Sequence, residues 1–260
     1  MKSNRSLCLG IGICLLLFGI PKLVRAQRTN ASSKDEDLAL RRLNNVHIEA
    51  QSIAQLFSDL SLHYDIPIGL EVAPNDNEFA DYRLDFTKGT LLDLLRQLVA
   101  EQTEYACEIK DGVVNVFPKD KYRDPILDEL LAAEISRFSV KENTSCWTLE
   151  KSLIATPEVR RVVETNGLTH AGVNFTGFYI PQVGRHFTFS VSKTTLKSIL
   201  NKVIRESPVA RIWVIKRYTS HHSFYIRLNA RGEDAASDVG EPGRIGRQDR
   251  RRFVDEPRDE

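Results

Sequence analysis

The sequence predicts an α+β fold made of two tandem small domains of βαβ-βαββ type, each with two helices packed on short sheets. Short runs of alternating apolar and polar residues, typical of half-buried strands, flank amphipathic helices. The pattern of residues 82–116 recurs about 105 residues later, which indicates an internal duplication. The chain has 260 residues, 42% of them hydrophobic and 27% charged, so it is long enough for two small domains.

The first 26 residues have the three-part pattern of a secretory signal peptide. Lys2 and Arg5 give a positive start, residues 7–20 carry no charge, and Val24-Arg25-Ala26 places small residues at the −3 and −1 positions of a cleavage site. We expect cleavage after Ala26 and export to the periplasm or the extracellular space. A retained anchor is the alternative, but this apolar run falls short of the ~20 residues that span a bilayer. Residues 27–39 are expected to form a linker.

Residues 40–119 are expected to form the first domain. Its upstream part reads as a strand, a helix and a second strand, and the first strand carries Val46, Ile48 and Ala50 in alternation. Its downstream part reads as a strand, a helix capped by Thr90, and a hairpin that turns at Asp111-Gly112. The apolar face of that helix repeats at helical spacing through Leu91, Leu94, Leu95, Leu98 and Val99.

Residues 137–230 are expected to form the second domain by repeating these elements. Residues 120–136 join the two domains through a short helix that opens at Pro125, and Pro157 is expected to start an additional helix or to kink the preceding one. We expect the extra residues of the second copy to lie in the loop at 170–177. At a shift of 105 the matched pairs are Tyr82 with Phe187, Leu84 with Phe189, Phe86 with Val191, Lys88 with Lys193, Thr90 with Thr195, Leu95 with Leu200 and Ile109 with Val214.

Charge is nearly balanced, and the last segment is polar. Residues 231–260 hold seven Arg and nine Asp or Glu, so we expect a disordered charged tail. The whole chain has 36 basic and 35 acidic residues, and signal cleavage would leave 32 against 35, a net charge of −3. Such a chain has no basic field for nucleic acid, and we expect no nucleic-acid partner.

The sequence contains no motif that carries chemistry. A phosphate-binding glycine loop, a His-Glu-x-x-His zinc motif and a nucleophile elbow are all missing, so we expect no catalysis, no metal and no cofactor. Cys107 and Cys146 remain after cleavage, and they could pair in an oxidising compartment or stay as buried free thiols. The isolated His170 favours a structural polar role. Trp147 and Trp213 are expected in the core.

The order of elements resembles the short amino-terminal domain of secretins and TonB-dependent transporters. Residues 46–71, VHIEAQSIAQLFSDLSLHYDIPIGLE, are similar to that family's opening strand, helix and strand, and residues 82–117 are similar to its closing strand, helix and hairpin. The first copy carries the resemblance over about 75 residues, and the second copy is degenerate. The resemblance implies a Gram-negative periplasmic module that docks protein partners through strands and helices, and the family has no catalytic residues to carry over.

Two functions follow as hypotheses from the sequence. The first is an exported adaptor that binds an unidentified envelope protein, with the strand of Val46, Ile48 and Ala50 as a candidate edge for a partner's extended segment. A purely structural, covered strand is the alternative interpretation of those residues. The second hypothesis is a secreted small-ligand-binding or hydrolytic protein with its site between the two domains.

Overall fold

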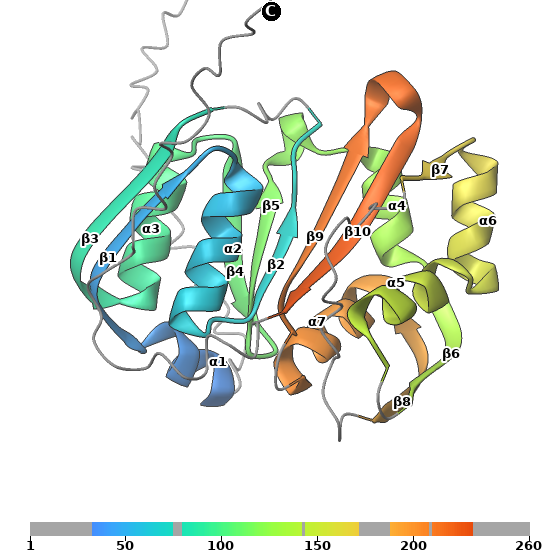
Figure 1. Ribbon diagram of the computed structural model, residues 1–260, viewed down its shortest axis with the longest axis horizontal. Coiled ribbons are helices and arrows are strands. Elements are labelled where there is room, and N and C mark those ends of the chain that lie inside the picture. The colour runs from blue at the N-terminus through green and yellow to red at the C-terminus, as the bar shows by residue number, and fades with distance from the viewer. Residues whose placement is uncertain (1–32, 75–79, 142–143, 172–187, 208–209, 231–260) are drawn as a thin grey trace, which may run out of the picture. The chain divides into compact units, whose positions relative to one another are not determined.

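The computed structural model describes residues 33–74, 80–141, 144–171, 188–207 and 210–230 (Figure 1). The predicted signal peptide with its cleavage after Ala26, the predicted strand around residues 178–180 and the predicted tail at 231–260 lie outside the described residues.

The elements up to residue 118 are called the first half of the molecule. In chain order they are α1 (Ser33–Ala39), β1 (Arg42–Ala50), α2 (Ile53–Tyr64), β2 (Ile68–Glu71), β3 (Tyr82–Thr90), α3 (Leu91–Glu101), β4 (Tyr105–Lys110) and β5 (Val113–Pro118).

A short connection leads to the second half, which begins at residue 134. The connection holds η1 (Asp120–Tyr122) and α4 (Pro125–Ala132). The second half holds β6 (Glu134–Val140), α5 (Cys146–Ile154), α6 (Pro157–Thr165), β7 (Thr169–His170), β8 (Phe189–Thr195), α7 (Leu196–Glu206), β9 (Ala210–Tyr218), η2 (Thr219–His221) and β10 (Ser223–Ala230). The α+β class is confirmed.

The local signals that predicted the elements act as expected. The Thr90 hydroxyl accepts the Asp93 backbone N–H, and the Asp93 carboxylate accepts the Thr90 N–H, so both polar groups satisfy the start of α3. Thr195 caps α7 through the N–H of Ser198. Asp111 and Gly112 both have positive φ angles, 56° and 73°, as a tight hairpin turn requires.

The predicted linker at 27–39 is partly wrong, because residues 33–39 form α1. Asp35 holds this helix in place: its carboxylate accepts the backbone N–H of Gly112 at the β4–β5 turn, at 2.5 Å. Leu38 packs against the core of the first half. These contacts stabilise a helix that is too short to form alone. The local sequence does not predict them, because they join residues that are far apart in the chain.

One six-stranded sheet runs through both halves in the order β4-β5-β2-β9-β10-β7. In the first half β4 is antiparallel to β5, and β5 is parallel to β2. The second half repeats this arrangement, with β9 antiparallel to β10 and β10 parallel to β7. Each half also has a two-stranded antiparallel sheet, β1–β3 in the first and β6–β8 in the second. The halves are joined by the parallel pairing of β2 with β9.

Two hydrophobic cores lie on opposite faces of this sheet. Helices α2 and α3 lie between the β1–β3 sheet and one face, while α5 and α7 lie between the other face and the β6–β8 sheet (Figure 1). Strand β9 contributes to both cores, because alternate side chains of a strand point to opposite faces. Ile212 and Val214 pack with the first half, and Trp213 and Ile215 pack with the second.

A division into two separate domains is not confirmed. The described residues from 33 to 230 form one compact unit, and the shared sheet explains why. The predicted match of Ile109 with Val214 is also wrong by one residue. Ile109 packs against its own half's core whereas Val214 packs against the other half's, and Ile215 is the residue that faces its own core. An irregularity where Ala210 and Ile212 pair with β10 shifts the register at this point.

Buried polar contacts stabilise the junction of the halves. Trp213 lies over Gly69, where an added Cβ would sit only 2.4 Å from the ring. The indole Nε1–H donates to Asn201 at 2.7 Å, and the Asn201 amide donates to Asn115 at 3.0 Å. Asn201 is on α7 in the second half and Asn115 on β5 in the first, so this chain of bonds fixes the two halves against each other.

Candidate functional site

The edge strand predicted from the sequence is β1. Val46, Ile48 and Ala50 point into the first core, with exposed fractions of 2%, 5% and 5%. Strand β1 pairs with β3 along one edge, and among the described residues no strand pairs with its other edge. A partner at this edge would therefore meet the backbone of β1 rather than the three predicted side chains.

The backbone groups that point outward from β1 can be identified from their neighbours. The carbonyl of Asp85 on β3 accepts a side-chain hydrogen bond from Gln97, so it points away from β1. Asp85 lies directly opposite His47, so the two residues form a non-hydrogen-bonded pair of the antiparallel ladder. The N–H and C=O groups of His47 therefore point away from β3, toward the outer edge of β1. Consistently, a hydrogen bond from the His47 backbone opposes the rise that burial causes in the pKa of Tyr64.

A charged cluster covers the solvent face of the β1–β3 sheet. The Asp85 carboxylate bonds to His47 Nδ1 and to Arg83 Nε, each at 2.6 Å. Hydrogen bonds from His47 and Arg83 lower the pKa of Asp85. Side chains of all three are more than half exposed, so these bonds add little stability, as is usual for surface ion pairs. They give the exposed face of this sheet a polar surface.

Carboxylates cap two other strand edges. Glu158 on α6 accepts the backbone N–H of Ser136 on β6 at 3.0 Å. Glu150 on α5 accepts the N–H of Leu228 on β10 at 2.5 Å. Glu150 is buried, and this burial raises its pKa to about 7, although the Leu228 N–H and Arg227 oppose the rise. Covering edges in this way is a general means of preventing unwanted strand pairing.

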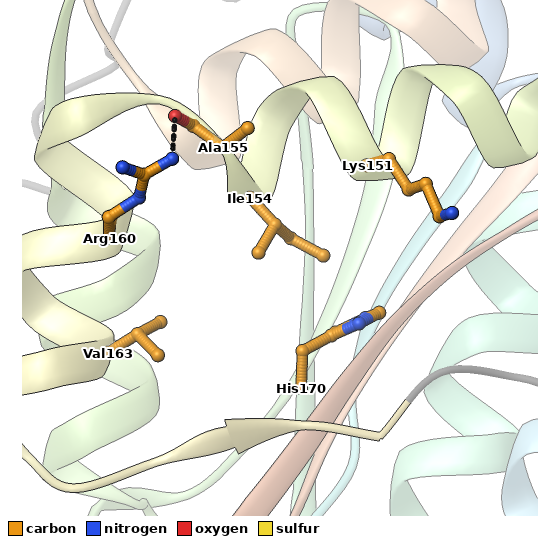
Figure 2. Close-up of a pocket in the computed structure, with 6 residues that line it drawn as sticks. All are labelled: Lys151, Ile154, Ala155, Arg160, Val163 and His170. Atoms are coloured by element: carbon orange, nitrogen blue, oxygen red, sulfur yellow. Dashed lines mark hydrogen bonds between the residues drawn. The ribbon is translucent and has the colours of Figure 1, made fainter.

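A pocket lies in the second half, where α5, α6 and β7 meet (Figure 2). Its volume is about 380 Å³, within the range of small-molecule pockets. Six residues line it: Lys151, Ile154, Ala155, Arg160, Val163 and His170. Figure 2 shows Ile154 and Val163 as the apolar lining, with Lys151 and Arg160 on different sides. The pocket was missed by the sequence analysis, and the helix break at Pro157 was its one local signal.

His170 was expected to have a structural polar role, and its surroundings are mostly apolar. Its ring packs edge-on against Phe224, with 5.4 Å between ring centres. In the described part of the chain its Nε2 atom is buried without a hydrogen-bond partner. Burial lowers the pKa of His170, and the nearby charge of Lys151 lowers it further, so the imidazole is neutral at pH 7.

The two tryptophans differ. Trp213 is fully buried, as expected. Trp147 is 40% exposed, which corrects the core assignment, and the Lys151 ammonium lies 3.5 Å above its ring centre. Trp147 therefore belongs to the surface next to the pocket.

The possible disulfide between Cys107 and Cys146 is not formed. Both are free thiols, and they lie in different cores: Cys107 packs with the first half and Cys146 with the second. Burial raises the pKa of both thiols, that of Cys146 to about 12, so neither has the character of a nucleophile. Spacing in the sequence could not decide this question, because it does not show on which side of the shared sheet each cysteine lies.

Within the described ranges, no group of three or more His, Cys, Asp or Glu side chains gathers in a way that could hold a metal ion. The helices of these ranges are also all too short or too polar to cross a membrane. Comparison of the chain with protein-family models, with curated proteins and with solved structures found no match.

Proposed function

We propose that this protein is an exported adaptor that binds an extended segment of an envelope protein along the outer edge of β1. The observation that carries the proposal is this nine-residue strand, which is paired on one side only within the described residues. An added strand gains backbone hydrogen bonds from such an edge, and neighbouring side chains give it specificity.

The edge of β1 is easier to occupy than the capped edges of the second half. At β6 and β10 an incoming strand would have to displace a carboxylate, and at β10 that carboxylate is buried. Losing its partner would leave Glu150 buried and unpaired, which is costly. At β1 the group that meets the edge is the neutral hydroxyl of Tyr64.

Exposed polar side chains lie beside the edge of β1 and would contact a bound segment. His47 and Glu49 alternate with the buried Val46, Ile48 and Ala50, so a partner strand would have polar neighbours on its solvent face. The resemblance to the amino-terminal domains of secretins and TonB-dependent transporters supports the same class of function, since it implies docking of protein partners in the periplasm.

Proline substitution at matched positions of the β1–β3 sheet tests the proposal. His47→Pro removes an outward N–H from β1, and Asp85→Pro removes the opposite one from β3. Both variants lose the His47–Asp85 contact, so they differ in which edge is changed. The full chain, with its predicted leader, would carry a photo-crosslinking residue in place of Glu49 and be expressed in its native host, so that the exported form is irradiated in the envelope.

We expect a protein adduct that His47→Pro reduces at least about tenfold and that Asp85→Pro leaves largely intact. Circular dichroism and thermal unfolding confirm that both variants are folded. Equal loss in both variants, or an adduct unaffected by His47→Pro, would refute docking at β1. Absence of any protein adduct, with a small molecule retained on the purified chain, would favour ligand binding as the main function.

A further inference from the structure

We infer that the pocket between α5, α6 and β7 binds a small amphiphilic anion, a molecule with one carboxylate and an apolar body. This inference is independent of the adaptor proposal, because β1 belongs to the first half and the pocket to the second. It also differs from a site between the two halves, since all six lining residues belong to the second half.

The pocket occurs where the second half departs from the first. In the first half a single helix, α2, runs without interruption from Ile53 to Tyr64. In the second half the corresponding helix α5 ends at Ile154, and Pro157 starts α6 in a new direction. The two helices diverge from the Ala155–Thr156 link and leave the hollow seen in Figure 2. The break between α5 and α6 therefore creates the pocket, and the uninterrupted helix α2 has no such break at the corresponding place.

The lining separates into an apolar part and a cationic part. Ile154 and Val163 are half-buried, and their side chains can cover the body of a ligand. The basic side chains of Lys151 and Arg160 are exposed at the rim. The neutral ring of His170 adds a flat surface next to the apolar part. This combination matches a carboxylate attached to a hydrocarbon or aromatic group.

The cationic groups keep bonding capacity for a ligand. Arg160 donates to the Ala155 carbonyl at 3.4 Å, a long bond that leaves most of its donors available. The ammonium of Lys151 lies on the Trp147 ring, which stabilises the charge without using its hydrogen-bond donors. Helix α6 has no side-chain cap, because the Thr156 hydroxyl donates to Leu153 instead, so its first N–H groups add to the positive potential.

Two acidic side chains of α5 and α6 are held away from the pocket. Glu150 is bonded to the backbone of β10, and Glu158 is bonded to Ser136 of β6. Neither carboxylate lines the pocket. Within the lining, the charged side chains are those of Lys151 and Arg160.

Titration calorimetry with octanoate and with octanol, its neutral counterpart, tests the inference on the mature chain. The variants are Arg160→Gln and Lys151→Gln, and the matched control is Arg161→Gln, which removes an exposed guanidinium from the same helix outside the lining. Thermal unfolding of each variant shows that the fold is intact. Inorganic phosphate serves as an anion without an apolar body.

We expect octanoate to bind, octanol and phosphate to bind at least about fivefold more weakly, and Arg160→Gln and Lys151→Gln each to weaken octanoate about fivefold. Arg161→Gln and the edge variant His47→Pro should leave the affinity unchanged. Equal binding of octanoate and octanol would show an apolar pocket without anion selection. An equal effect of Arg160→Gln and Arg161→Gln would show general charge attraction, and no binding at millimolar octanoate would exclude the site; each of these results overturns the inference.

Discussion

The two halves of the molecule share a strand order but differ in what covers the edges of their strands. In the first half, β2 lies between β5 and β9, so strands cover both of its edges and all four of its residues are buried. In the second half, β7 has only two described residues and pairs with β10 alone. The first half is thus closed by a strand from the second, whereas the second half has carboxylate caps, an additional helix and a pocket. Two halves with the same strand arrangement therefore differ in what their edges and surfaces offer.

The largest expected effect concerns the residue that joins the halves. Trp213→Ala should lower the free energy of unfolding by about 3–5 kcal/mol, because it removes a buried ring and leaves the Asn201 carbonyl without its donor. Trp147→Ala is the control and should cost less than about 1 kcal/mol, since its side chain is on the surface. Urea denaturation measures both. Similar losses for the two variants would contradict the shared-sheet interpretation.

The second effect compares equivalent positions on α2 and α5. Phe57 follows the Ser52 cap as Glu150 follows the Ser145 cap, so a buried aromatic ring of the first half is replaced by a buried carboxyl in the second. The Glu150 pKa is about 7 in the folded chain and 4.5 unfolded, so between these pH values the unfolded state has released a proton that the folded state retains.

Stability should therefore fall as pH rises from 4.5 to 7, on the order of 3 kcal/mol in all, and Glu150→Gln should remove this dependence. Urea denaturation at pH 5 and pH 8 measures it. Glu158→Gln provides the opposite case: hydrogen bonds from Ser136 lower the Glu158 pKa, so its contribution is present above pH 4.5 and lost as pH falls. A pH profile unchanged by Glu150→Gln would mean that the Leu228 bond outweighs burial.

The third effect concerns close approach at the junction. Gly69→Ala should cost about 1–3 kcal/mol, because its Cβ would overlap the Trp213 ring and both groups are buried. The double variant Gly69→Ala with Trp213→Ala separates this steric cost from any effect of glycine on the backbone. If the substitution costs the same with and without the ring, steric overlap is not the cause.

The smallest expected effect compares the helix caps of α3 and α7. Thr90→Ala and Thr195→Ala should each cost about 1 kcal/mol, and Thr90→Ala should cost a few tenths more. The reason is that the Thr90 hydroxyl also donates to the Asp93 carboxylate at 2.7 Å, whereas the Thr195 hydroxyl shares a bond with the neutral Ser198 hydroxyl. Thermal unfolding of both variants, with Asp93→Ser as a third, measures the difference. Equal losses would show that the bond to the Asp93 carboxylate adds nothing.

Local features of the fold could be predicted from the sequence, and long-range ones could not. Alternation, the Thr90 and Thr195 caps and the Asp111-Gly112 turn act over a few residues, so each predicted its element. The sharing of the sheet depends on which strand lies beside β2. A signal existed in the uninterrupted apolar run from Ile212 to Ile215, which is typical of a strand buried on both faces. The candidate β1 edge followed from alternation, but its side chains point inward and its backbone carries the proposal.

The pocket was beyond local prediction for a related reason. Pro157 indicated where one helix stops, but the direction of α6 depends on its packing against α4 and β6. Ile154, Val163 and His170 come together only after that packing. The cysteines likewise could be assigned to separate cores only once the faces of the shared sheet were known.

The pairing of β2 with β9 has a consequence for biosynthesis. Ile212 and Val214 complete the core of the first half, so that core stays open to water until more than 140 residues after β2 have left the ribosome. Contacts so distant in sequence form slowly and leave apolar surface exposed in the meantime. If the chain is exported as we propose, this delay would help it to cross the membrane, because a nascent chain that has not completed its first core stays unfolded enough to pass through a translocation pore.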